Sequence, residues 1–202
     1  MKVYAFGDSH AGKFGNDSRF VLVGPPAPTA YGLGNEKSRS ESLFILRQML
    51  HEVEQNDIIL FVLGEIDCRV HVYRQSIITG RHPNDIISDT VEKYGHIIKS
   101  VRDDNNVNVA VHDVPPATAQ PNVYLLDHYG TRDQRAEIAR RFNFILGNWC
   151  EKNDICFVQL YPYISDERGW LKEEYAIEDG AHVSEEVVPF VVQELRKCFP
   201  SL

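Results

Sequence analysis

The chain opens with VYAFGDSH (3–10), an apolar run that breaks at once into small and polar residues. The first four residues have the β-branched and aromatic composition of a strand, and Gly7 to His10 follow it directly. Such a turn suits two kinds of chemistry. Ser9 is placed as a nucleophile at the end of a strand, whereas Asp8 and His10 are placed as two ligands of a metal ion.

Four further apolar runs predict strands at 20–23, 57–63, 107–114 and 155–160. Segments with helical periodicity alternate with these strands, at 38–55, 84–101, 132–152 and 183–199. Strands that alternate with helices predict an α/β fold with a parallel sheet flanked by helices. Pro189 lies inside the last predicted helix and is expected in its first turn or at a kink.

Composition limits the partners and the location of the protein. The 202 residues suffice for one domain, 1–202, and the formal net charge of −8 argues against nucleic-acid or anionic-membrane partners. No apolar run approaches the roughly 20 residues of a membrane span, and the first strand leaves no room for a signal peptide. The four cysteines include no CxxC pair and are too few for a disulfide scaffold. We therefore expect a reducing, cytoplasmic setting.

A late segment, EDGAH (178–182), supplies the groups that a serine nucleophile needs. A serine hydroxyl requires a base to remove its proton and a third group to orient that base. His182 and Asp179 are three residues apart in one predicted loop, just before the last helix. Ligands of open parallel sheets bind at the carboxyl ends of the strands, where the turn around Ser9 is also expected.

These motifs resemble those of the SGNH (GDSL-type) hydrolase superfamily. FGDSH (6–10) is similar to its first block and DGAH (179–182) to its last, while GLG (32–34) and GEID (64–67) stand where its second and third blocks belong. The resemblance implies a three-layer α/β/α sandwich of flavodoxin-like kind with about five parallel strands, and ester hydrolysis or acyl transfer without a cofactor. It also implies that Ser9 is the nucleophile, His182 the base and Asp179 its orienting partner.

The resemblance further implies an oxyanion hole, in which the backbone N–H groups of Ser9 and of a glycine in the second block donate to the oxyanion. We select Gly34 for this glycine, with Gly32 as the competitor. The family's third block has an asparagine donor where this chain has Ile66. Nearby Glu65 and Arg69 are candidate oxyanion or substrate residues, and the alternative for this stretch is a surface ion pair between Asp67 and Arg69.

The metal hypothesis rests on a second resemblance. Asp8-x-His10 followed by Gly12 resembles the opening ligand motif of calcineurin-like metallophosphoesterases, and LGEIDCR (63–69) is similar to a later block of theirs but one residue short. Their Gly-Asn-His-Asp/Glu segment has no counterpart here, and GNW (147–149) has no histidine. His112 and His128 are the remaining candidates to complete a set of metal ligands.

The substrate is expected to be an O-acetylated sugar or glycan, or another small ester, because SGNH hydrolases commonly act on acylated carbohydrates. An uncharged acetyl ester suits a site without a basic pocket. The basic stretch RDQRAEIARR (132–141) interleaves acidic residues at helical spacing, which predicts a solvated helix face. The sequence leaves open hydrolase or transferase, a catalytically weak carbohydrate-binding relative, and the oligomeric state.

Overall fold

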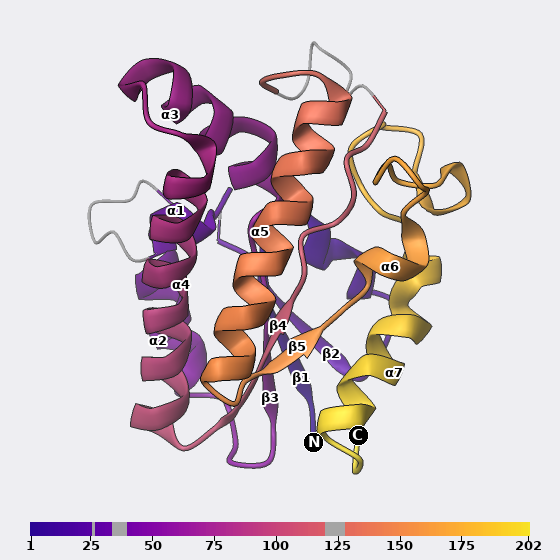
Figure 1. Cartoon of the computed structure of the whole chain (residues 1–202). Coiled ribbons are helices and arrows are strands. Elements are labelled where there is room, and N and C mark those ends of the chain that lie inside the picture. Colours follow the sequence, from indigo (N-terminus) through magenta and orange to yellow (C-terminus); the bar gives the residue numbers. More distant parts are fainter. Residues whose placement is uncertain (26, 34–39, 120–127) are drawn as a thin grey trace.

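The computed structural model describes residues 1–25, 27–33, 40–119 and 128–202, and its strands form one five-stranded parallel sheet (Figure 1). The strands are β1 (Val3–Gly7), β2 (Phe20–Val23), β3 (Ile58–Val62), β4 (Asn108–His112) and β5 (Cys156–Val158). Their order across the sheet is β2-β1-β3-β4-β5, and every neighbouring pair is parallel. The five strands predicted from the apolar runs are confirmed.

Helices cover both faces of the sheet, so the three-layer α/β/α architecture is also confirmed (Figure 1). One face packs against α1 (Ala30–Leu33), α2 (Ser42–Leu50), α4 (Pro83–Asn105) and α5 (Arg132–Lys152). The other face packs against the 3₁₀ helix η1 (Ser9–Phe14), α6 (Tyr161–Ile164), the 3₁₀ helix η4 (Glu185–Val187) and α7 (Val188–Cys198).

The two hydrophobic cores follow from the alternation of side chains along the strands. In β1, Val3 and Ala5 belong to the core under α7, whereas Tyr4 and Phe6 belong to the core under α4 and α5. The central strand β3 is buried throughout, and its side chains alternate between the two cores in the same way. This burial on both faces explains why the strand is apolar over consecutive residues.

The predicted helices differ from the observed ones mainly at their ends. The helix predicted at 132–152 coincides with α5. Pro189 lies in the first turn of α7, which is one of the two positions expected for it. The helix at 84–101 is longer in the structure, because α4 continues until Asn106 adopts a left-handed conformation (φ 52°) that ends it. The helix predicted at 38–55 is shorter, because α2 begins after Glu41, which has positive φ, and the chain turns after Leu50.

Six short helices of the described residues were not predicted, and two of them are η1 and α6. The other four are the π-helix η2 (Asp67–His71), α3 (Val72–Thr79), the 3₁₀ helix η3 (Glu173–Tyr175) and α1. Among the described residues, no helix combines the length and the apolar character needed to cross a bilayer.

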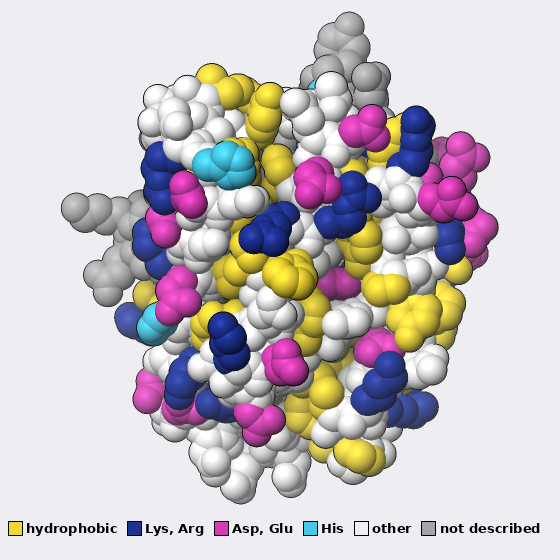
Figure 2. Space-filling model, viewed as in Figure 1, with side chains coloured by type: hydrophobic (Ala, Val, Ile, Leu, Met, Phe, Trp, Pro, Cys, Tyr) yellow, Lys and Arg dark blue, Asp and Glu magenta, His cyan; other side chains and the backbone are white. Residues whose placement is uncertain are grey.

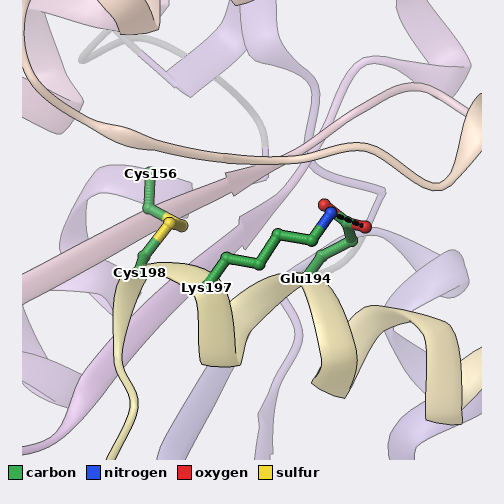
Figure 3. The surroundings of a disulfide bond; sticks show 4 residues. All are labelled: Cys156, Glu194, Lys197 and Cys198. Atoms are coloured by element: carbon green, nitrogen blue, oxygen red, sulfur yellow. Dashed lines mark hydrogen bonds and ion pairs between the residues drawn. A yellow bond between two sulfur atoms is a disulfide. The ribbon is translucent and has the colours of Figure 1, made fainter.

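A disulfide bond joins Cys156 at the start of β5 to Cys198 at the end of α7 (Figure 3). Their Cα atoms lie 6.1 Å apart, although 42 residues separate them in sequence. Cys68 and Cys150 are free and buried. The four cysteines were predicted to be too few for a disulfide scaffold, and the structure pairs two of them in one bond, which fixes α7 to the sheet.

The strand order creates a crevice at the carboxyl ends of β1 and β3. From β1 the chain moves outward to β2, and it then returns to the opposite side of β1 to form β3. Open α/β sheets bind their ligands at such a topological switch point. Ser9 follows β1 and the GEIDCR segment (64–69) follows β3, so both lie at this crevice.

Candidate active site

Ser9, His182 and Asp179 form a hydrogen-bonded triad at the carboxyl end of the sheet. The Ser9 hydroxyl lies 2.6 Å from Nε2 of His182, and Nδ1 of His182 lies 2.5 Å from Oδ2 of Asp179. A carboxylate only accepts hydrogen bonds, so Nδ1 carries the proton in this arrangement and Nε2 is left to accept from Ser9. The structure thus brings together three residues that the sequence separates by up to 173 positions.

The loop that carries Asp179 orients it toward the imidazole. Oδ1 of Asp179 accepts the backbone N–H groups of Ala181 (2.8 Å) and His182 (3.0 Å), in the manner of an Asx turn. Burial alone would raise the pKa of Asp179, but the His182 ring and these two N–H groups outweigh it, and the pKa lies below its ordinary value. Asp179 is therefore an anion at neutral pH and holds the ring in one orientation.

Ser9 is placed by the turn that precedes it. The backbone of Gly7 approaches β3 so closely that an added Cβ would lie 2.3 Å from the carbonyl oxygen of Val62. The Asp8 N–H donates to the same carbonyl, and Oδ1 of Asp8 accepts the His10 N–H (2.9 Å), which caps η1. Ser9 is the exposed first residue of η1, where a backbone N–H has no acceptor within the helix.

The segment after β3 forms a buried polar cluster beside the triad. Arg69 Nε donates to Oε1 of Glu65 (2.7 Å), and Oε2 of Glu65 lies 3.8 Å from His10 Nε2. The Asp67 carboxylate instead accepts the backbone N–H groups of Ala30 (2.7 Å) and Tyr31 (3.1 Å) at the start of α1. The alternative of an exposed Asp67–Arg69 ion pair is therefore wrong, since both side chains are buried and each has another partner.

The predicted oxyanion donors are only partly located. Gly34 lies outside the described residues, and the N–H of its competitor Gly32 donates to Thr29 Oγ1 (2.8 Å). Ile66 is half-buried and offers no side-chain donor. Of the oxyanion donors predicted from the sequence, the structure therefore locates one beside the Ser9 hydroxyl, which is the backbone N–H of Ser9 itself.

Asp8 and His10, the two sequence neighbours of Ser9, are buried, and in the described part of the chain they belong to no set of metal ligands. The two residues are 5% and 3% exposed, and the described residues contain no group of three or more His, Cys, Asp or Glu side chains placed to hold a metal ion. Burial and the nearby Glu65 raise the pKa of Asp8 to about 8. His112 is fully buried and uses its ring nitrogens toward Lys13 Nζ (3.2 Å) and the Asp113 carbonyl oxygen (2.6 Å).

Arg135 is a residue that sequence analysis missed. The stretch 132–141 was expected to be a solvated face, but the Arg135 residue is only 4% exposed. Its position follows from helical spacing, because Ile138, Ala139 and Phe142, three, four and seven residues later, are also buried. Arg135 and Arg69 both line a cavity beside the triad, so the expectation of a site without a basic pocket is corrected.

Comparisons with known proteins define the class of fold. The sequence matches no family model and no curated protein. The structure is similar to a GDSL-like lipase from Bacteroides thetaiotaomicron (16% identity, covering 98% of this chain and 87% of that one, TM-score 0.59). It is also similar to a carbohydrate acetylesterase from Sinorhizobium meliloti (15% identity, covering 100% and 99%, TM-score 0.62). A third similar structure is an acetyl xylan esterase (12% identity, covering 100% of both chains, TM-score 0.55).

These likenesses span nearly the whole chain at low identity, so they establish the fold. The protein has the α/β fold of the SGNH (GDSL-type) hydrolases, as its four sequence motifs predict.

Proposed function

We propose that this protein is a serine esterase or acyltransferase that acts on an acylated, O-acetylated carbohydrate or small ester. The observation that carries the proposal is the hydrogen-bonded triad of Ser9, His182 and Asp179. The triad lies at the switch point of a sheet whose structural neighbours include two acetylesterases by their descriptions. Its geometry matches the arrangement that activates a serine hydroxyl.

In the first half of the reaction, Oγ of Ser9 attacks the ester carbonyl while Nε2 of His182 takes the hydroxyl proton. The imidazolium that forms is stabilised by the Asp179 carboxylate, which remains ionised. The tetrahedral intermediate collapses, the bond to the alcohol breaks, and His182 returns its proton to the departing alkoxide. An acyl group is then esterified to Ser9.

In the second half, His182 removes a proton from an acceptor hydroxyl, which attacks the acyl group on Ser9. Water as the acceptor makes the protein a hydrolase, and a sugar hydroxyl makes it a transferase. The two activities share the same side chains up to this step. Both release the acyl group and return the proton to Ser9.

The oxyanion hole of this protein is built without the family's asparagine. Removing one such donor typically costs about 2.7–4 kcal/mol of transition-state stabilisation. We assign the Ser9 backbone N–H as one donor and the 32–34 block as the source of another. Arg69, in the segment that contains Ile66, is the candidate that replaces the asparagine.

The disulfide bears on where this reaction takes place. Disulfides persist in oxidising compartments and are rare in the cytosol. The Cys156–Cys198 bond therefore favours an oxidising environment over the cytoplasmic one predicted from the number of cysteines.

On the face shown in Figure 2, positive and negative side chains are interspersed, and this pattern supports a small ester over a nucleic acid as the partner.

Turnover of 4-nitrophenyl acetate by wild type and Ser9→Ala tests the proposal. Ser9 is exposed, so truncation of its hydroxyl removes little packing, and we expect the variant to lose nearly all activity with an unchanged melting temperature. Ser88→Ala, which changes an exposed serine on α4, is the matched control and should behave like wild type. Retention of wild-type turnover by Ser9→Ala would show that another residue is the nucleophile.

A further inference from the structure

A small cavity of about 20 Å³ opens beside the triad. Its wall includes Ala181, which directly precedes the triad histidine, and Glu65 and Arg69 from the segment after β3. Glu65 also approaches His10, whose ring centroid lies 5.0 Å from that of His182. The cavity therefore adjoins the loop that carries Asp179 and His182. It has room for a small polar group but not for a sugar ring.

Arg135 reaches this cavity from α5 with an unsatisfied donor. Its residue is 4% exposed, and Nη2 makes a long hydrogen bond to the Thr118 carbonyl oxygen (3.4 Å). Its Nε is buried and has no hydrogen-bond partner in the described part of the chain. Burial lowers the pKa of Arg135, which reports a cation removed from water. A buried guanidinium N–H without an acceptor lowers the stability of the fold unless a ligand accepts its hydrogen bond.

On the described part of the cavity wall, positively charged side chains outnumber negatively charged ones. The wall carries two guanidinium groups, Arg69 and Arg135, but one carboxylate, Glu65, which accepts from Arg69 Nε. The remaining wall is largely apolar, with Val114, Pro115 and Ala139. A monoanionic ligand would pair with the Arg135 guanidinium, whose Nε has no acceptor in the described part of the chain. A carboxylate fits best, because its two oxygens lie in a plane that matches the guanidinium fork, and it is small.

We propose that this cavity binds a carboxylate group of the substrate through Arg135, so that the preferred ester is an acidic one. The proposal rests on the esterase or acyltransferase function proposed above and narrows its substrate class. It replaces the uncharged acetyl ester expected from the sequence. The carboxylate belongs either to the acyl group or to the alcohol part of the ester, because the cavity borders the loop that carries Asp179 and His182.

Three chromogenic esters distinguish these possibilities: 4-nitrophenyl acetate is neutral, 4-nitrophenyl hydrogen succinate carries a carboxylate on the acyl side, and 4-acetoxy-3-nitrobenzoate carries one on the alcohol side. Each rate is corrected for spontaneous hydrolysis. We expect one acidic ester to exceed the neutral one in kcat/KM by roughly tenfold to a hundredfold, as a charge-assisted hydrogen bond in a buried site would give. The acidic ester that is preferred identifies the source of the carboxylate.

Arg135→Met tests the residue itself. It removes the charge but keeps an unbranched apolar stem, and the ratio of acidic to neutral kcat/KM should fall toward one through a higher KM for the acidic ester. Arg141→Gln removes a positive charge from an exposed position on the same helix and should keep the wild-type ratio. A wild-type protein that prefers the neutral ester, or an Arg135→Met protein that keeps the acidic preference, would overturn the proposal.

A binding measurement separates failure of this proposal from failure of the proposed function. Succinate should raise the melting temperature of wild type and of Ser9→Ala, but not that of Arg135→Met, whereas an equal concentration of chloride should have no such effect. Neutral-ester turnover that depends on Ser9, without stabilisation by succinate, would overturn the carboxylate site alone. Stabilisation by inorganic phosphate but not by succinate would also overturn it. Succinate binding without turnover of any ester would instead overturn the esterase function.

Discussion

At the scale of single residues, the hydrogen bond of Asp179 to the His182 ring can be tested separately from the contacts that Asp179 makes within its own loop. Its Oδ1 accepts two backbone N–H groups, and its Oδ2 accepts from the His182 ring. Asp179→Asn can keep the Oδ1 contacts but presents an amide to Nδ1, which favours the wrong tautomer of His182. We expect turnover of 4-nitrophenyl acetate to fall by roughly 10³ to 10⁴ with little change in melting temperature. Glu178→Gln, at the exposed neighbouring position, is the control.

Asp8 provides a pH-dependent test at the same scale. Its pKa is about 8 in the folded protein, against an ordinary 3.8, so the folded state holds one more proton than the unfolded state between these values. The contribution of Asp8 to stability therefore falls as pH rises from about 4 to about 8 and stays low above that. Asp8→Asn can still accept the His10 N–H but does not titrate. Its melting temperature relative to wild type should increase between about pH 5 and about pH 9.

Lys13 is buried nearby, and its pKa is lowered to about 8 by burial. Lys13 is present in wild type and in Asp8→Asn alike, so the difference in melting temperature between these two proteins depends mainly on Asp8. Asp89→Asn, on the exposed face of α4, should show no such trend. A melting-temperature difference for Asp8→Asn that is constant with pH would mean that Asp8 titrates normally in the folded protein.

At the scale of elements, the strands could be predicted because burial on both faces leaves a plain apolar signature. β3 and the core of β4 have this signature, and α5 has a clear helical period. α3 lacks one, because Ile77 and Ile78 are each 64% exposed and do not mark a buried stripe. The end of α2 could not be predicted either, since Val53 continues the apolar period after the helix has ended.

The disulfide is a contact between elements that spacing along the chain does not reveal. It closes a loop of 42 residues, for which the loss of unfolded-state entropy predicts a stabilisation of about 4 kcal/mol. The double variant Cys156→Ser with Cys198→Ser should therefore melt roughly 10 °C below oxidised wild type. A reductant should lower the melting temperature of wild type toward this value and leave the double variant unchanged. Equal melting temperatures of oxidised and reduced wild type would contradict a stabilising bond.

At the scale of the whole molecule, the fold class and the triad could be predicted from motifs at the two ends of the chain, because a parallel α/β sheet gathers its loops at one edge. The polar network behind the triad could not. Glu65 and Arg69 were selected as candidates, but the capping role of Asp67 depends on α1, 36 residues away. The burial of Arg135 could not be predicted either. Neither the net charge of −8 nor the charge pattern of the 132–141 stretch indicates that one of its arginines is buried.

The catalytic role of Ser9 is tested most directly by covalent labelling with a fluorophosphonate, followed by peptide mass spectrometry. An activated serine forms a stable phosphonyl ester with the reagent, and the fluoride departs. We expect one adduct, on the peptide that contains Ser9, formed rapidly in wild type, slowly in His182→Ala and not at all in Ser9→Ala. The absence of an adduct from wild type that turns over esters, or an adduct on a different residue, would contradict the assignment of Ser9 as the nucleophile.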